Sequence, residues 1–296
     1  DNLGALIEAE LDRVDHSMST YKPDSEINRF NRLAVNQPMA VSSEFLEVLT
    51  IAQSVWLNSD GALDPSVGPL VDLWGFGPSP SEDQIPSDEQ ISAALATVGF
   101  DAVMIDTNEQ TIAKSRPVAI DLSAVAKGYA VDLVADLLEM NALPDYLVEV
   151  GGETRVSGLN PEGQPWRLAI ESPVLIGQIE RVLALTNGAV ATSGDYRNYF
   201  ERDGARYSHT IDPRSGQPIG HTLASVTLLA DTCAEADAWA TALMVLGDKR
   251  GLELANRLGL AVYMLSRDNG EFTASYSKTF EPYMAVATQQ AASEES

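Results

Sequence analysis

The stretch V-A-I-D-L-S-A-V-A-K-G, residues 118–128, decides how the middle of the chain folds. A strand is predicted over 118–121, and it passes directly into a helix predicted over 123–140 with Ser123 as its N-cap. Lys127 follows one helical turn later, so exposed N–H groups and an ammonium group lie together at the helix start. This combination suits a phosphate, and a capped helix with a solvated lysine is an alternative of equal weight. The phosphate-loop pattern G-x-x-x-x-G-K-[ST] is absent.

Helices and strands alternate irregularly on both sides of this stretch. Apolar residues at helical spacing predict helices, and short apolar runs between turn residues predict strands and hairpins. Because a regular βα repeat is missing, the predicted fold class is α+β, with mixed sheets and packed helices. The other predicted helices are 3–14, 42–57, 87–97, 233–246 and 250–258, and the other predicted strands are 103–105, 111–113, 146–150, 166–171, 181–186, 189–192, 206–211, 223–229, 261–266 and 272–276.

Two long segments lack this periodicity. Residues 17–31 are predicted to form a polar loop. Residues 61–86 are dense in Gly and Pro, as expected for an ordered surface or binding loop whose turns fix the backbone. No convincing linker or internal repeat divides the chain, so a single domain is predicted over residues 1–287. The remaining residues, 288–296, are small and polar and are predicted to form a frayed tail.

Composition restricts the classes of partner. The 296 residues are 45% apolar, which is enough for a substantial core, and no apolar run approaches the roughly 18 residues of a membrane-spanning helix. The 43 acidic residues outnumber the 19 basic ones, and this balance disfavours binding to nucleic acids and anionic membranes. A polyphosphate ligand would therefore need local attraction from a bound cation, a positioned lysine and helix N-termini. Cys233 is the only cysteine, which excludes an internal disulfide.

A second candidate site lies in A-E-A-D-A-W-A-T-A-L, residues 234–243. Asp237 and Thr241 are four residues apart, so their side chains lie on one face of the predicted helix, one above the other. Both offer hard oxygen ligands, and Mg²⁺ favours a few protein oxygens completed by phosphate and water. An aspartate near a helix N-terminus beside a threonine that merely packs is the alternative, and taken alone it is the better one.

A third candidate lies in Y-S-H-T-I-D-P-R-S-G, residues 207–216, where a predicted strand ends in a turn closed by Gly216. His209 on this strand could accept a proton from an attacking hydroxyl or hold a phosphate. An equally weighted alternative is a structural histidine that hydrogen-bonds the turn. Tight turns that allow close approach of a ligand are also predicted at 151–152 and at T-S-G-D-Y, residues 192–196.

Eight motifs follow one another along the chain, and their ordered combination is far more specific than any single motif. The motifs are M-S-T-Y-K-P-D-S-E-I-N-R-F-N (18–31), G-A-L-D-P-S-V-G-P-L (61–70), L-W-G-F-G-P (73–78), D-L-S-A-V-A-K-G-Y-A-V-D (121–132), G-G-E (151–153), S-G-D-Y (193–196), H-T-I-D-P-R-S-G (209–216) and A-D-A-W-A-T-A-L-M-V-L-G (236–247). In this combination the chain resembles the ApbE family of FAD:protein FMN transferases, formerly described as thiamine-biosynthesis lipoproteins. The resemblance implies a T-fold-like α+β architecture of two lobes with the FAD site between them.

The resemblance also implies roles for individual residues. It implies Mg²⁺ ligands at the side chains of Asp237 and Thr241 and at the backbone carbonyl of Ala124. It implies that His209 and Asp237 take part in catalysis. Contacts with FAD are implied for Tyr21, Ala62, Leu63, Asp64, Asp121, Lys127 and Ile211.

Two aromatic side chains are candidates for stacking on a flavin. They are Tyr21 and Trp74, and core or rim packing is the alternative for both. Family members normally open with a short strand carrying an M-G-T-type segment that touches the cofactor, whereas this sequence opens on its first predicted helix.

The activity that the resemblance implies is Mg²⁺-dependent cleavage of FAD, with FMN linked to a Ser or Thr hydroxyl of an acceptor flavoprotein and AMP released. Expected acceptors are flavoprotein subunits of sodium-pumping (Nqr-type) or Rnf-type redox complexes. The expected location is the periplasmic side of the bacterial inner membrane, with a lipid anchor on an N-terminal leader as the only membrane contact. Two alternatives stay open, an FAD pyrophosphatase that gives free FMN and AMP, and a flavin-binding carrier without turnover.

Overall fold

The computed structural model describes residues 2–77, 85–173, 178–195, 198–202, 204–268 and 271–284. The fold is α+β, as predicted, and the chain divides into two compact units. The first unit comprises Asp1–Ala126 and Asn198–Gly220, and the second comprises Lys127–Arg197 and His221–Ser296. The single domain predicted over 1–287 stays a prediction, and the frayed tail predicted over 288–296 lies outside the described residues.

The second unit is built on an antiparallel sheet with the strand order β15-β14-β13-β8-β5-β4. Strand β13 is buried along nearly its whole length, because neighbours cover both faces of the sheet at its centre. This arrangement explains why its sequence, LASVTLLA, is almost continuously apolar. The strands are β4 Tyr146–Val150, β5 Glu153–Ser157, β8 Asn187–Gly194, β13 Leu223–Ala230, β14 Ala261–Asp268 and β15 Glu271–Tyr276.

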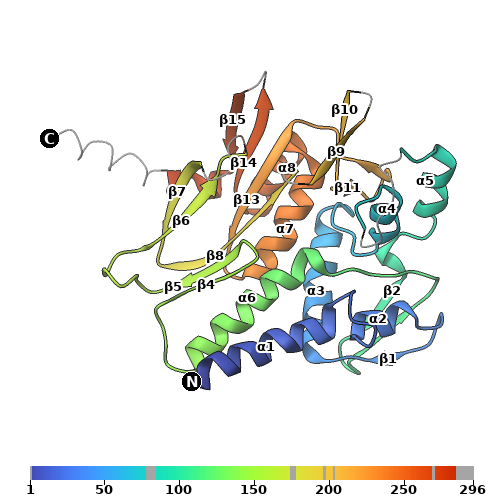
Figure 1. Ribbon diagram of the computed structural model, residues 1–296, viewed down its shortest axis with the longest axis horizontal. Coiled ribbons are helices and arrows are strands. Elements are labelled where there is room, and N and C mark those ends of the chain that lie inside the picture. The colour runs from blue at the N-terminus through green and yellow to red at the C-terminus, as the bar shows by residue number, and fades with distance from the viewer. Residues whose placement is uncertain are drawn as a thin grey trace. The chain divides into compact units, whose positions relative to one another are not determined.

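Helices cover one face of this sheet. Helix α7 (Cys233–Leu246) packs along β8 and β13, and α8 (Asp248–Leu258) packs against α7 and β14 (Figure 1). Helix α6 (Ser123–Met140) begins in the first unit, and its residues from Lys127 onward belong to the second. Within the described part of the chain, no helix is both long enough and apolar enough to span a bilayer.

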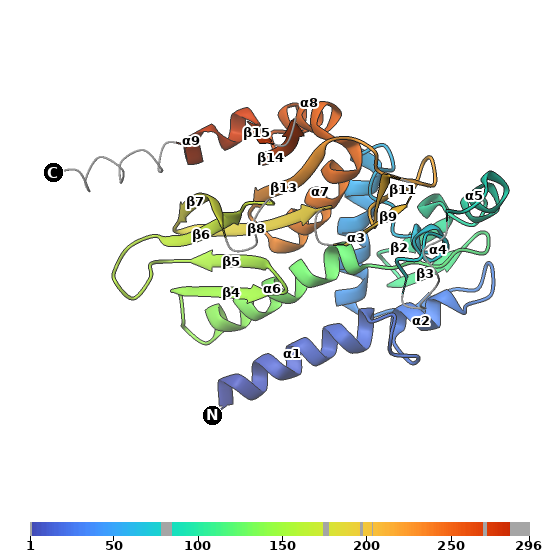
Figure 2. The same ribbon diagram turned by 45° about the horizontal axis from the view of Figure 1, so that its top comes forward.

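An antiparallel ribbon packs on the other face of the sheet. It consists of β6 (Trp166–Glu171) and β7 (Ile179–Leu185), and Figure 2 shows it next to β8. A short C-terminal segment, η2 (Lys278–Phe280) with α9 (Glu281–Met284), joins the same apolar cluster. The buried residues of this cluster are Val156, Ile170, Leu183, Leu185, Val190, Leu229, Ala261, Tyr263, Leu265 and Phe280.

The first unit combines helices with short antiparallel pairs. Its small sheet has the order β1-β3-β2, and two hairpins, β9–β10 and β11–β12, come from the second part of the unit. The helices are α1 Asn2–Met18, α2 Glu26–Asn31, α3 Ser43–Asn58, α4 Gly68–Leu73, α5 Asp88–Leu95 and η1 Phe100–Ala102. The strands are β1 Met39–Ala40, β2 Val103–Asp106, β3 Thr111–Lys114, β9 Tyr199–Arg202, β10 Ala205–Ser208, β11 Ile211–Asp212 and β12 Gln217–Pro218.

Several sequence predictions need correction. Residues 118–121 form no strand, because the backbone of Ile120 bonds to the side chain of Asn31 and the N–H of Asp121 donates to the Pro65 carbonyl. The carboxylate of Asp121, and not Ser123, caps α6, because it accepts the backbone N–H of Ser123 at 2.7 Å. The strand predicted over 206–211 is two strands, β10 and β11, which leave His209 and Thr210 between them.

Other corrections concern predicted loops and turns. Residues 17–31 and 61–86, predicted as loops, contain the short helices α2 and α4. The turn predicted at 192–196 is wrong for residues 192–194, which continue strand β8, and Tyr196 lies outside the described residues. The turn at 151–152 is confirmed, since both glycines have the positive φ values that glycine tolerates, 64° and 100°. Strands β1, β5, β9 and β12 were not predicted.

Helix α6 meets the start of α7 at Gly128. A Cβ atom built on Gly128 would lie 2.2 Å from the carbonyl oxygen of Cys233, so the two backbones touch. Only glycine allows this approach without moving one of the helices. The contact brings the first turns of α7 against the part of α6 that carries Lys127.

We predict that Gly128→Ala destabilises the protein by about 3 kcal/mol, since the added methyl group would overlap a rigid backbone. Urea unfolding followed by circular dichroism measures the loss. The matched control is Gly4→Ala in helix α1, where nothing lies within 4 Å of the new Cβ. That change should stabilise the protein by about 0.5 kcal/mol through helix propensity. Equal stabilities for the two variants would contradict the packing role of Gly128.

Candidate active site

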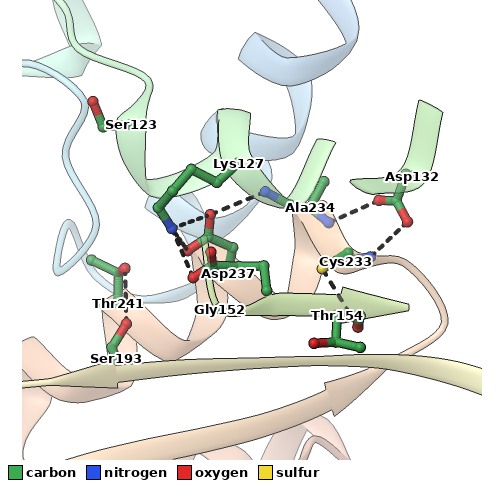
Figure 3. A network of polar contacts seen from close by, with 12 residues as sticks. Ser123, Lys127, Asp132, Gly152, Thr154, Ser193, Cys233, Ala234, Asp237 and Thr241 are labelled. Carbon is green, nitrogen blue, oxygen red and sulfur yellow. Dashed lines mark hydrogen bonds and ion pairs between the residues drawn. The ribbon is translucent and has the colours of Figure 1, made fainter. Parts of the chain in front are cut away.

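The carboxylate of Asp132 fixes the start of helix α7. It accepts the backbone N–H groups of Cys233 and Ala234, each at 2.9 Å, and its own position is held by Arg155 at 3.0 Å (Figure 3). These are two of the N–H groups that a helix start leaves without partners, and a negative charge is favourable at that end. Burial raises the pKa of Asp132, while the two N–H groups and Arg155 act in the opposite direction. Asp132 is thus a structural support of the site.

We predict that Asp132→Asn lowers the free energy of unfolding by about 2 kcal/mol, because an amide can accept with only one atom and leaves one N–H of α7 unpaired. Asp136→Asn is the control. Asp136 contacts the same Arg155 at 3.2 Å, but its side chain is 55% exposed against 10% for Asp132. Its loss should cost no more than about 0.5 kcal/mol. Thermal unfolding of both variants measures the two losses of stability. Equal losses for Asp132→Asn and Asp136→Asn would rule out the capping role of Asp132.

Lys127 joins two buried carboxylates. Its ammonium lies 2.7 Å from Oε1 of Glu153 and 3.3 and 3.4 Å from the two oxygens of Asp237. The N–H of Gly128 also donates to Asp237 at 3.3 Å. Figure 3 shows Lys127 reaching from α6 towards Asp237 on α7. The Lys127 side chain stays 45% exposed, whereas those of Asp237 and Glu153 are 5% and 6% exposed.

The electrostatics of this cluster follow from its burial. Burial raises the pKa of Asp237, although Lys127 and the N–H of Gly128 oppose the shift. Burial also raises the pKa of Glu153, and the nearby Asp237 charge adds to that effect. For Lys127 burial is the largest single influence and lowers its pKa, but the two carboxylates together outweigh it and raise the pKa above its usual value. Two acids therefore face one permanent ammonium, an arrangement that suits an additional cation.

Thr241 extends the cluster by one helical turn. Its hydroxyl lies 3.2 Å from that of Ser193 on β8 (Figure 3). Asp237 and Thr241 thus present a carboxylate and a hydroxyl along one face of α7, as predicted from their spacing. The described residues include no group of three or more His, Cys, Asp or Glu side chains that could hold a metal ion. A hard cation here would use few protein oxygens and take the rest from its ligand, which fits Mg²⁺.

The other predicted site residues belong to the first unit. Ala62 and Leu63 are buried, and the Asp64 carboxylate is engaged within the unit, where it accepts the N–H groups of Ser66 at 2.8 Å and Phe100 at 3.2 Å. Tyr21 is 80% exposed. The remaining predicted site residues of this unit are Asp121, Ala124, His209 and Ile211.

His209 lies between the two hairpins of the first unit. Its Nδ1 donates to the carbonyl oxygen of Asn198 at 2.9 Å, and its ring and that of Phe76 form a T-shaped pair. The buried side chain of Ile211 packs in the apolar cluster that contains Trp74. Trp74 is itself buried, stacks on Tyr207 and donates from its indole N–H to the carbonyl of Gly216, so packing is its observed role.

The sequence prediction missed the parts of the cluster that surround Asp237. Gly128 and Asp132 stood inside the quoted motif 121–132, four residues apart and hence on one helix face. Glu153 stood in G-G-E and Ser193 in S-G-D-Y, but neither received a role. The spacing of Gly128 and Asp132 was a usable signal, whereas nothing local pointed to Glu153 or Ser193.

The fold and the cluster define an α+β protein whose site combines two buried acids, a partly exposed lysine and a hydroxyl, and suits a cation and a phosphate. The family model described as the ApbE family matches residues 2–264, and the chain belongs to this family. It is similar to the FAD:protein FMN transferase of Haemophilus influenzae, with 47% identity over 283 residues, 93% of this chain and 81% of that protein.

Further relatives agree with this assignment. The FAD:protein FMN transferase of Escherichia coli K12 is 43% identical over 282 residues, 94% of this chain and 80% of that protein. The solved structure of the flavin transferase ApbE from Vibrio cholerae superposes with a TM-score of 0.88 at 42% identity, covering 95% of this chain and 90% of that one. The predicted family and the predicted fold class are confirmed.

Proposed function

We propose that this chain is an FAD:protein FMN transferase that requires Mg²⁺. It would split the pyrophosphate of FAD, attach FMN through a phosphoester to a Ser or Thr hydroxyl of an acceptor flavoprotein, and release AMP. The observation that carries the proposal is the cluster of Lys127, Asp237 and Thr241, which places an ammonium beside a buried carboxylate and a hydroxyl. The curated relatives named FAD:protein FMN transferase support the reaction class.

The cation would be held by the side chains of Asp237 and Thr241 and by the carbonyl of Ala124. When bound, Mg²⁺ supplies neutralisation of the pyrophosphate charge and polarisation of the phosphorus on the FMN side. Lys127, which keeps its proton, contributes a second positive charge for the phosphate oxygens. Phosphoryl transfer depends mostly on positioning and charge neutralisation, so a site with few functional groups suffices.

The acceptor hydroxyl forms a new P–O bond while the bond from phosphorus to the AMP oxygen breaks. Its proton needs a base, and we assign this role to His209. Because Nδ1 of His209 donates to a backbone carbonyl, which can only accept, Nε2 is the nitrogen that can take the proton in the neutral ring. Asp121, Ile211, Tyr21 and the stretch 62–64 complete the proposed contacts with FAD.

The partners and location are part of the same proposal. The acceptors are flavoprotein subunits of Nqr-type or Rnf-type redox complexes, and the reaction takes place on the periplasmic side of the inner membrane. The net charge of −24 supports a protein acceptor over nucleic acid, since it repels phosphate backbones.

We predict that Asp237→Ala lowers the rate of FMN transfer by about a hundredfold or more while the protein stays folded, because the charge that holds the cation is gone. The control is Glu235→Ala, an exposed carboxylate on the same helix, which should keep activity within about twofold since it is screened by solvent. Purified variants are incubated with FAD, Mg²⁺ and an acceptor flavoprotein, and the covalent FMN adduct is quantified by mass spectrometry. Undiminished adduct from the Asp237 variant would refute the assignment.

The same reaction without acceptor separates the transferase from its alternatives. A transferase gives little AMP until the acceptor is added, and AMP and adduct then form together. An FAD pyrophosphatase releases FMN and AMP at the same rate with or without acceptor. A flavin-binding carrier gives no AMP in either case. Either of the last two results would replace the proposed function.

A further inference from the structure

Glu153 is buried beside the proposed reaction centre without an assigned role. It is the first residue of strand β5 and follows the turn at 151–152. One of its carboxylate oxygens bonds Lys127, and the other, Oε2, is buried with no hydrogen-bond partner among the described residues. A buried carboxylate with an unpaired oxygen is unfavourable for folding, so its presence at this position points to a function.

The distances within the cluster are unequal. The Lys127 ammonium lies 2.7 Å from Glu153, the length of a strong charge-assisted hydrogen bond, but 3.3 and 3.4 Å from the oxygens of Asp237. Lys127 is therefore anchored to Glu153 and makes only long contacts with Asp237. Glu153 reaches Lys127 from β5, whereas Asp237 reaches it from α7. Because the turn at 151–152 places Glu153 at the start of β5, it also sets the position of the ammonium that Glu153 holds.

We propose that Glu153 is a positioning residue that holds the ammonium of Lys127 away from Asp237 and so keeps the Asp237 carboxylate available for a divalent cation. This inference rests on the proposed Mg²⁺ site. An ammonium and a metal ion compete for the same carboxylate oxygens, because each needs a negative partner and the Asp237 side chain is only 5% exposed. If Glu153 were neutral, Asp237 would be the one remaining carboxylate at the Lys127 ammonium within the described cluster. Lys127 would then move onto Asp237, and a cation would have to displace it.

The test measures metal affinity and not transfer activity. Mn²⁺ is the probe, since its free form gives a paramagnetic resonance signal that disappears on binding, and competition by Mg²⁺ identifies the shared site. The proteins are the full chain and its variants Glu153→Gln, Lys127→Met and the double variant, purified without FAD. The control is Glu149→Gln, an exposed carboxylate on strand β4 that carries the same charge and accepts the N–H of Gly152 at 3.2 Å.

We expect Glu153→Gln to weaken Mn²⁺ binding on the order of tenfold, because Lys127 then competes for Asp237. Lys127→Met should tighten Mn²⁺ binding, since the competitor is gone. In that background the further change Glu153→Gln should alter affinity by less than about threefold, which is the coupling expected when one residue acts through another. Glu149→Gln should leave affinity within about twofold, as screening predicts for an exposed charge.

Three outcomes would overturn the inference. An equal loss of affinity from Glu153→Gln in both backgrounds would show that Glu153 acts directly on the cation, while the metal site itself would stand. If Lys127→Met binds Mn²⁺ with unchanged or weaker affinity, Lys127 does not compete with the cation. This comparison uses the single variant and does not depend on a substitution at Glu153. If the unmodified protein binds no Mn²⁺ that Mg²⁺ displaces, the proposed metal requirement fails and the inference fails with it.

Discussion

The contact between the backbones of α6 and α7 at Gly128 is the constraint on which the site depends. Because no side chain separates the helices there, the N–H of Gly128 reaches the Asp237 carboxylate and Lys127 arrives on the same side. Asp132 secures the approach by capping α7 one turn further along α6. Helix α6 thus serves the Asp237 carboxylate of α7 in three ways. Lys127 supplies a positive charge, Gly128 allows the close approach of the helices, and Asp132 caps α7.

Neither the long-range field of the protein nor the charge of its site cluster attracts an anionic substrate by itself. The protein carries a net charge of −24, so its long-range field repels FAD, although salt screens that field beyond about 8 Å. Within the cluster two carboxylates outnumber one ammonium, which attracts a cation and not a phosphate. A divalent ion, if bound as proposed, would reverse this balance, because the net charge of the two carboxylates and Lys127 would change from negative to positive.

The sequence was informative wherever the site depends on one helix. The four-residue spacing of Asp237 and Thr241 placed them on one face of α7, and the helix that carries Lys127 was predicted with its observed bounds. The sequence could not predict the contacts of Ser193 and Glu153, because these contacts depend on pairing between strands that are distant in the chain. Ser193 meets Thr241 because β8 pairs with β13 in the register that sets Ser193 opposite Val226, and Glu153 meets Lys127 because β5 turns back along β4. Residues 118–121 have strand-like composition, yet a side chain and a loop carbonyl satisfy their backbone, which no local pattern reveals.

The composition of α7 supplies a final argument that Asp237 serves a ligand. Its alanines at 234, 236, 238, 240 and 242 are all buried, so most of the helix is enclosed, and the side chain of Asp237 is only 5% exposed. In such surroundings an ion pair contributes little net stability, and apolar residues of similar volume would often be neutral or stabilising. A leucine or methionine at position 237 would serve packing at least as well as an aspartate that needs Lys127 and Gly128 as partners. The proposed role of Asp237 as a cation ligand would explain the cost of keeping this charge, since packing alone does not require it.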